Sequence, residues 1–326
     1  MGKAWGRNLR DNPDTEIAGW IDILPDAAAK ACEEIGITPE WVGSDLETAI
    51  HSLHPDFVVD VSSPSGHREV TLTALGLGVP VLGEKPMATS LTEAKEMVAA
   101  SEQAGKLYMV SQSRRYDGRL QAYRALLESS LGKLGILKSD FYIGAHFGGF
   151  RDEMENVLLV DMAIHTFDAA RYLSASDPIA VYADEFNPSW SWYRGNASAS
   201  CIFEMTDGLR YTYSGSWCAE GSPTSWEAEW RAVGEKGTCL WDGHGDPNGQ
   251  IVVAPAGFHS EVEDISTQSL PIKTGIAGSL AEFVWALKTG GIPNGECHDN
   301  IKSFAMVCAA VESARRRQRV ELAELL

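Results

Sequence analysis

The sequence predicts an α/β protein that begins with a doubly wound parallel sheet and continues into an α+β region with a large, mostly antiparallel sheet. Strand and helix signals alternate over roughly the first 110 residues. The strands in that part are continuous apolar runs, which is typical of parallel strands covered on both faces. Later strands alternate apolar and polar residues instead, as one-face-buried antiparallel strands do. Because 326 residues exceed one average domain, we expect two domains, residues 1–113 and 114–326.

The first domain has four strand signals, at 16–22, 57–63, 79–83 and 107–111. Helices are expected between them, at 25–36, 66–75 and 90–105. Pro25 near the start and Gly36 just past the end delimit the first of these helices. Ser90 and Glu93 form a capping box that opens the last one. Strands and helices in this close succession favour a parallel sheet.

The second domain is expected to contain strands at 198–205, 209–218 and 224–234, and helices at 155–173, 278–289 and 299–317. Antiparallel strands in series build a broad sheet. Its outer face carries enough aromatic residues to form a subunit interface, although core packing is an equally good explanation. We expect a homo-oligomer, a dimer or tetramer, assembled through this sheet, and the last helices to pack back on the first domain.

The opening of the chain reads as a helix, a turn and then a strand that ends in Asp22. In a dinucleotide-binding unit, a strand precedes a G-x-G-x-x-G turn and a helix, and an acidic residue about 20 positions on binds the ribose. Gly2 and Asp22 have this spacing, so Gly2 corresponds to the third glycine. Alternatively, Gly2 is a small residue beside the initiator and Asp22 an ordinary turn residue.

On the first interpretation, the strand and two glycines that normally come before Gly2 are missing from the 326 residues. We expect Met1 to be an internal methionine of a longer reading frame, or the chain to be a truncated relative. The first strand of such a sheet lies centrally, so its loss leaves a gap at the sheet centre or a distorted first unit, and weak NAD binding.

Composition excludes several classes of function. The formal net charge of −18 repels nucleic acid and anionic lipid, and no apolar run is long enough to span a bilayer. The N-terminus has no secretory signal pattern. Six scattered cysteines without a C-x-x-C pair argue against a disulfide framework or a zinc site, and fit a reducing cytoplasm.

Two further segments are candidates for chemistry. Lys85 lies just past a buried strand, at the edge where open α/β sheets bind ligands. Alternatively, Lys85 is an ordinary solvated lysine.

In the helix expected at 155–173, the polar residues Asp161, His165 and Asp168 form one stripe on an otherwise apolar helix. We expect this stripe to face a wet cleft. Histidine moves protons near neutral pH. A structural His–Asp pair, or a metal site, are the alternatives.

Taken together, four motifs resemble the Gfo/Idh/MocA family of nicotinamide-dependent oxidoreductases, which includes glucose–fructose oxidoreductase and inositol dehydrogenase. They are EKP at 84–86, VSSPSGHREVTLTAL at 61–75, SRRYDG at 113–118 and D-x-x-x-H at 161–165. The resemblance implies an N-terminal Rossmann domain, here without its first strand, and a C-terminal α/β domain. It also implies hydride transfer between nicotinamide and a secondary hydroxyl of a sugar, polyol or sugar acid. Asp22 favours NAD over NADP, because a carboxylate repels the 2′-phosphate.

The same resemblance assigns site residues. Lys85 corresponds to the lysine that hydrogen-bonds the reacting hydroxyl, Asp161 positions the substrate and His165 is the general acid/base. The expected cofactor contacts are Gly2, Trp5, Asp22, Ser62, Ser63, Pro64, His67, Glu84, Lys85 and Pro86. The expected substrate contacts are Arg114, Arg115, Tyr116, Asp161 and His165, and no metal is expected. The segment before Asp161, MENVLLVD, departs from the glycine-rich lead-in usual in the family.

Two other functions are compatible with the same fold. One is a glycoside hydrolase that uses NAD transiently. The other is a dinucleotide-binding module without turnover, which the truncated glycine loop favours and the complete Lys85, Asp161 and His165 set disfavours.

Overall fold

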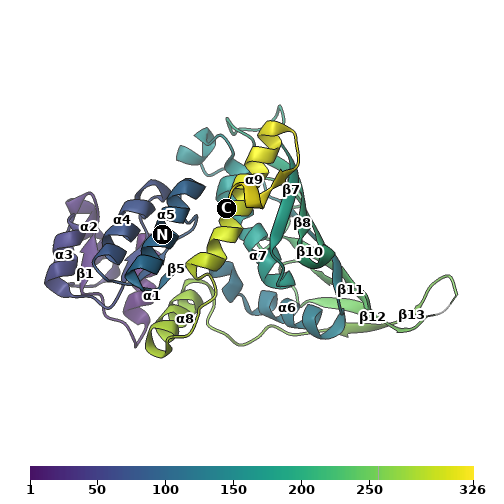
Figure 1. Ribbon diagram of the computed structural model, residues 1–326, viewed down its shortest axis with the longest axis horizontal. Helices are drawn as coiled ribbons and strands as arrows, with labels where there is room; N and C mark the ends of the chain where they lie inside the picture. The colour runs from purple at the N-terminus through teal and green to yellow at the C-terminus, as the bar shows by residue number, and fades with distance from the viewer. Residues whose placement is uncertain (256) are drawn as a thin grey trace. The chain divides into compact units, whose positions relative to one another are not determined.

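The computed structural model describes residues 1–255 and 257–326, which divide into two compact units (Figure 1). The first unit consists of Met1–Ser113 and Lys273–Ile301, and the second of Arg114–Ile272 and Lys302–Leu326. None of the helices described has the length and apolar character needed to cross a membrane.

The first unit is built from short parallel strands and the helices between them. Its strands are β1 (Gly19–Ile21), β2 (Trp41–Gly43), β3 (Val58–Asp60), β4 (Val81–Gly83) and β5 (Tyr108–Val110). Its helices are α1 (Gly2–Asp11), α2 (Pro25–Ile35), α3 (Leu46–Leu53), α4 (Pro64–Gly76), α5 (Leu91–Ala104) and α8 (Gly275–Thr289). The predicted parallel α/β class is confirmed.

Several predicted boundaries were wrong. β2 and α3 were not predicted at all, and β3 ends at Asp60 rather than at residue 63. The strand stops early because Pro64 occupies the first turn of α4, where its fixed φ suits a helix start. The capping signal at Ser90 is confirmed, since its side chain accepts a hydrogen bond from the Glu93 N–H.

The parallel strands of the first unit form two separate sheets. β1 pairs only with β2, whereas β3, β4 and β5 form a three-stranded sheet. Within the described residues, no strand joins β1 to β3. The expected break in this sheet is therefore present.

Helix α1 packs closely on the two-stranded sheet. A Cβ atom at Gly6 would lie 2.5 Å from Ile35 Cδ1 and 2.7 Å from a ring carbon of Trp20, so only glycine permits this approach. Helix α8 joins the unit from the far end of the sequence. Its Phe283 ring meets Phe57 edge to face at 5.4 Å, and its Lys288 pairs with Asp14 at 2.5 Å.

The second unit is organised around a nine-stranded sheet in the order β13-β12-β11-β10-β6-β9-β8-β7-β14. All neighbouring strands are antiparallel except β6 and β9, which confirms the prediction of a large, mostly antiparallel sheet. The strands are β6 (Leu134–Tyr142), β7 (Pro178–Phe186), β8 (Ser198–Met205), β9 (Arg210–Ser216), β10 (Glu229–Gly234), β11 (Gly237–Trp241), β12 (Asn248–Ala254), β13 (Glu261–Ser266) and β14 (Val320–Glu321).

One face of this sheet is covered by α6 (Gly118–Ser130) and α7 (Ile164–Ser174), and α9 (Cys297–Arg316) continues into the unit (Figure 1). Phe167 of α7 packs edge to face on Phe203 at 4.9 Å and on Tyr213 at 5.3 Å. Each of these rings is essentially inaccessible to solvent. The core of the unit therefore lies between α7 and the middle of the sheet.

Candidate functional site

The carboxyl ends of β3 and β4 carry a set of buried polar contacts. Asp60 ends β3, and its carboxylate accepts hydrogen bonds from the Ser62 N–H at 3.0 Å and the Ser62 hydroxyl at 2.6 Å. Its other oxygen lies 2.8 Å from Nδ1 of His67, whose side chain is only 2% exposed. His67 therefore fixes the turn into α4, and its role as a cofactor contact stays a prediction.

Trp5 also has a partner within the protein. Its side chain is 1% exposed, and its Nε1–H donates to Glu84 Oε1 at 2.6 Å. The second oxygen of Glu84 accepts from the Lys85 N–H at 3.1 Å. Trp5 and Glu84 are thus buried supports for the backbone that presents Lys85, and their roles as cofactor contacts stay predictions. Pro86 is buried as well, and Lys85 is half-buried.

The other expected cofactor residues lie at accessible strand and helix ends. Asp22 follows β1 and is half-buried, and its carboxylate accepts a hydrogen bond from the Leu24 N–H at 2.9 Å. Gly2 begins α1, whose first turn contains no acidic residue and no side-chain cap. Ser63 and Pro64 are exposed at the start of α4.

In the second unit, the segment expected to be one regular α-helix has two parts. Leu158–Ala163 is a π-helix, and α7 begins only at Ile164. A π-turn is wider than an α-turn and changes which side chains share a face; such turns are frequent at functional sites. Asp161 lies in the π-helix and His165 in the first turn of α7.

The expected stripe of three polar side chains is broken by Asp168. This carboxylate is buried and accepts two hydrogen bonds from Arg115, at 2.6 and 2.7 Å, and one from the Ser303 hydroxyl at 2.7 Å. The prediction that Asp168 faces a wet cleft with the other two is wrong. Arg115, which was expected to contact substrate, is the buried partner in this ion pair, and Tyr116 beside it is also buried.

Asp161 instead has a partner that the sequence did not indicate. Its side chain is 13% exposed, and Oδ2 accepts from Nε of Arg151 at 2.6 Å. The Arg151 guanidinium also lies over the rings of Phe147 at 4.9 Å and Phe150 at 4.7 Å. Both rings are largely exposed, so an aromatic surface borders the carboxylate.

Arg114 also contacts the π-helix, with one guanidinium nitrogen 3.5 Å from Met162 Sδ. It donates to the Trp226 carbonyl and lies 3.6 Å from Glu227 Oε2. Burial lowers the pKa of Arg114, although arginine stays charged in proteins. Burial is the main cause of a raised pKa at Glu227. The positive charge of Arg114 opposes this shift.

Sequence reasoning missed Arg151, Phe147, Phe150 and Glu227. Arg151 follows two glycines at φ of about 70°, in a loop whose path no periodic pattern reveals. The pattern F-G-G-F-R at 147–151 was the only local signal, because paired aromatic residues around a flexible turn are typical of a binding loop.

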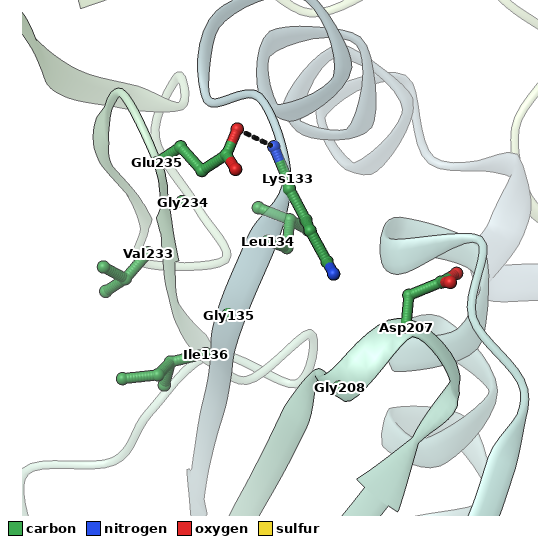
Figure 2. Close-up of a pocket in the computed structure, with 9 residues that line it drawn as sticks. All are labelled: Lys133, Leu134, Gly135, Ile136, Asp207, Gly208, Val233, Gly234 and Glu235. Carbon is green, nitrogen blue, oxygen red and sulfur yellow. Dashed lines mark hydrogen bonds between the residues drawn. The ribbon is translucent and has the colours of Figure 1, made fainter.

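A separate open hollow lies at one end of the large sheet (Figure 2). It is lined by residues of β6, of β10 and of the segments beside them, three of which are glycines, and Glu235 accepts a hydrogen bond from the Lys133 N–H at 3.3 Å. It contains none of the residues discussed above, so we do not consider it the functional site.

Comparison with known proteins decides the family. Residues 1–112 match the oxidoreductase family with an NAD-binding Rossmann fold, and residues 119–240 match the GFO/IDH/MocA C-terminal domain. The chain belongs to the Gfo/Idh/MocA family. The predicted resemblance, the oxidoreductase class and the cofactor NAD are thereby confirmed.

Relatives in this family include a D-apiose dehydrogenase of Rhizobium rhizogenes, 27% identical over 83% of this chain and 80% of the relative. An inositol 2-dehydrogenase of Streptomyces avermitilis is 26% identical over 93% and 87% of the two chains. Among solved structures, an oxidoreductase from Agrobacterium radiobacter in complex with NAD+, L-tartaric acid and magnesium superposes with a TM-score of 0.86. It is 24% identical and covers 100% of this chain and 96% of its own, which shows the shared fold.

The accessible residues of this family member fit part of an NAD molecule. Asp22 has a carboxylate at a strand end, the usual partner of the ribose hydroxyls. The start of α1 offers backbone N–H groups without a competing acidic side chain, which suits an anionic pyrophosphate. The buried side chains of Trp5 and His67 are used within the protein.

Proposed function

We propose that this chain oxidises a secondary hydroxyl of a sugar, polyol or sugar acid with NAD, or carries out the reverse reduction. The observation that carries this proposal is the pairing of Asp161 in a π-helix with Arg151, one turn before His165. This arrangement supplies a fixed hydrogen-bonding carboxylate and an imidazole on a rigid element. Polyhydroxylated substrates need such fixed partners for their hydroxyl groups.

Charge balance around the π-helix narrows the substrate class. Arg151 is paired with Asp161, and Arg114 lies beside Glu227. Each of these two guanidinium groups therefore has its own carboxylate, so neither is left over to pair with a substrate carboxylate. This balance favours a neutral sugar or polyol over a sugar acid. The exposed Phe147 and Phe150 rings offer apolar surface for the C–H face of a sugar ring.

The proposed roles follow from ordinary acid–base chemistry. When bound, NAD supplies a nicotinamide ring that accepts or gives a hydride. His165 accepts the hydroxyl proton during oxidation and returns it during reduction. Asp161 accepts a hydrogen bond from the substrate and keeps it oriented. Lys85, held by the Glu84 contact to its backbone, stabilises negative charge on the reacting oxygen. Asp22 accepts hydrogen bonds from the ribose hydroxyls.

The decisive experiment measures absorbance of the reduced nicotinamide. The purified 326-residue chain is incubated with NAD and a panel of neutral sugars, polyols, sugar acids and aryl-glycosides. We expect NADH to accumulate with at least one neutral sugar or polyol, and to accumulate more slowly with the matching sugar acid.

The rival functions give different results in the same assay. Release of the aryl group without net NADH would indicate a glycoside hydrolase that uses NAD transiently. Binding of NAD by calorimetry without turnover on any member of the panel would favour a non-catalytic dinucleotide-binding module and contradict the proposal.

A further inference from the structure

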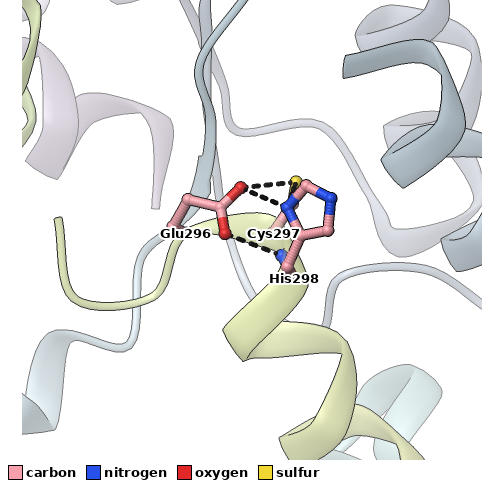
Figure 3. A group of neighbouring side chains, drawn as sticks. All are labelled: Glu296, Cys297 and His298. Atoms are coloured by element: carbon pink, nitrogen blue, oxygen red, sulfur yellow. Dashed lines mark hydrogen bonds and ion pairs between the residues drawn. The ribbon is translucent and has the colours of Figure 1, made fainter. Parts of the chain in front are cut away.

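Three side chains with metal-binding atoms converge at the start of α9. They belong to the consecutive residues Glu296, Cys297 and His298, and they point toward one another (Figure 3). Glu296 Oε1 lies 3.0 Å from Cys297 Sγ and 2.7 Å from His298 Nδ1. Cys297 Sγ and His298 Nδ1 are 3.5 Å apart. A carboxylate oxygen, a sulfur and an imidazole nitrogen therefore occupy the corners of a small triangle.

The backbone at the helix start produces this convergence. Glu296 Oε2 accepts a hydrogen bond from the His298 N–H at 3.0 Å, which folds the carboxylate back over the first turn of α9. This contact uses only one carboxylate oxygen, so Oε1 remains directed at the sulfur and the imidazole. No C-x-x-C spacing is involved, which is why the sequence did not indicate a metal site.

A second carboxylate lies behind the histidine. His298 Nε2 is 2.9 Å from Oε1 of Glu102, near the end of α5. In metal sites, a ligating histidine almost always donates its other ring N–H to such an acceptor, which fixes the tautomer and orients the ring. When Nε2–H donates to Glu102, Nδ1 is the ring nitrogen left for a bound ion, which would replace the present contact of Nδ1 with Glu296 Oε1.

The separations are close to those around a tetrahedral ion. Metal–ligand distances of about 2.0 Å for N and O and about 2.3 Å for S place N and S about 3.5 Å apart and N and O about 3.3 Å apart. The Cys297–His298 distance of 3.5 Å already has this value. Only Glu296 Oε1 must move outward, by about 0.5–0.6 Å relative to both partners, to reach the geometry expected for such ligands.

We propose that Glu296, Cys297 and His298 bind a thiophilic divalent cation, of which Zn²⁺ is the best fit, with Glu102 as the positioning residue behind His298. A thiolate and an imidazole select zinc over magnesium or calcium, which prefer oxygen ligands only. Three protein ligands leave a fourth position for water. Cys297 is fully buried and His298 is exposed, so the ion enters from the histidine side.

A bound ion at this point reinforces a junction within the first unit. The Val110 N–H donates to the Gly295 carbonyl at 2.8 Å, and Met109 and Glu296 form an isolated antiparallel bridge. The segment before α9 is thus attached to β5, and Glu102 attaches it to α5. Since an ion that binds only the folded state stabilises it, we expect Zn²⁺ to raise the melting temperature.

The test uses the 326-residue chain, stripped with a chelator under reducing conditions and titrated with Zn²⁺ against a chromophoric chelator. We expect one equivalent of Zn²⁺ per chain, and a thiolate-to-cobalt charge-transfer absorption when Co²⁺ is used instead. Cys297→Ser should abolish that absorption and His298→Asn should weaken binding strongly. Glu102→Gln should lower the affinity by about 10–100-fold, as loss of an outer carboxylate does.

Matched controls are Cys308→Ser, a cysteine outside the cluster, and His51→Asn, an exposed histidine beside Glu47. Both should bind Zn²⁺ like the parent. The proposal is overturned if the parent binds no equivalent of Zn²⁺, because the three side chains then serve only to cap α9. It is also overturned if His298→Asn binds as tightly as His51→Asn. His298 is exposed, so this comparison holds even if Cys297→Ser does not fold.

Discussion

At the residue scale, Glu185 on β7 is a strongly perturbed carboxyl group. Asn156 and Asn196 donate to its Oε2 at 2.6 and 3.4 Å, and Asn156 directly precedes the turn into the π-helix. Burial raises the pKa of Glu185 to about 7, and the two amide contacts only partly oppose this. The folded protein therefore binds this proton more tightly than the unfolded chain.

The sign of the pH dependence follows from that difference. Between the ordinary glutamate pKa and about 7, the free energy of unfolding should fall as pH rises, and it should level off above that range. Glu185→Gln should remove this slope and stabilise the protein at pH 8, by an amount of the order of 1–3 kcal/mol. Urea unfolding at several pH values measures both effects. Glu261→Gln, an exposed carboxylate on β13, is the control. A slope in Glu185→Gln equal to that of the parent would contradict the prediction.

The proposed acid–base residues give a second prediction at this scale. His165→Ala and Lys85→Ala should each lower kcat by roughly 10²–10⁴-fold, which is the usual contribution of a positioned proton-transfer group. NAD binding by calorimetry should persist in both variants. His259→Asn, an exposed histidine in a loop, should keep the parent turnover. Parent-like turnover in either of the first two variants would remove that residue from the mechanism.

Asp22 determines the expected choice of cofactor. Asp22→Asn keeps an oxygen to accept from the Leu24 N–H and removes only the charge that repels a 2′-phosphate. The ratio of the NADP and NAD dissociation constants should therefore fall, by roughly ten-fold or more. Asp26→Asn, in the first turn of α2, tests for a general charge effect. The interpretation of Asp22 is wrong if the parent already binds NADP more tightly than NAD.

At the residue scale, position could be predicted better than environment. The places of Lys85 and Asp22 at strand ends could be found because strand ends are readable from the apolar runs before them. The burial of Trp5 and His67 was not foreseen, because it depends on distant or buried partners. The hydrogen bond between Trp5 and Glu84 joins residues 79 positions apart. No local sequence pattern indicates that these two side chains turn into the interior and meet there.

At the element scale, the outer face of the large sheet, defined by Ile136, Tyr182, Phe186 and Ile202, exposes apolar and aromatic side chains. Tyr182 on β7 lies opposite Ile202 on β8, and both side chains are about half exposed, at 51% and 52%. Ile136 on β6 and Phe186 on β7 are similarly exposed. We propose that a second copy of the chain covers this face, because apolar and aromatic side chains of neighbouring strands are typical of a homo-oligomer interface.

A charged residue in the centre of that face should weaken the assembly. Ile202→Glu is expected to lower the molar mass measured by light scattering with size-exclusion chromatography, since burying an unpaired carboxylate is costly. Val262→Glu, at a similarly exposed apolar position on the edge strand β13, should leave the mass unchanged. A monomeric parent, or an unchanged mass in Ile202→Glu, would contradict this arrangement.

Element-level prediction was strongest for long or clearly delimited segments. The parallel strands β1, β3, β4 and β5, the strands β8, β9 and β10 of the large sheet, and helices such as α2 and α5 follow from apolar runs, periodicity and end signals. β2 was missed because Trp41–Gly43 does not lie in a continuous apolar run like those that indicate β3 and β4. The π-helix was missed because its composition is that of an α-helix. Asp168 departs from the expected stripe because its carboxylate is buried in the ion pair with Arg115, a partner 53 positions away.

At the scale of the whole molecule, the two units are not two consecutive stretches of chain. Residues 273–301 belong to the first unit, although the second unit occupies the 159 residues from Arg114 to Ile272 that precede them. Local sequence signals give the type and limits of a helix such as α8, but not the unit that it joins. That information lies in particular packing partners, such as Phe283 on Phe57.

The placement of α8 has a consequence for how the protein is made. A ribosome that adds about 5–20 residues per second needs roughly 10–40 s to proceed from residue 113 to residue 301. Throughout that interval, the nascent first unit lacks the Phe283 ring and the Lys288 charge that later meet Phe57 and Asp14. Its apolar surface around Phe57 therefore stays uncovered while the second unit is still emerging, and transiently exposed apolar surface of this kind is prone to aggregation.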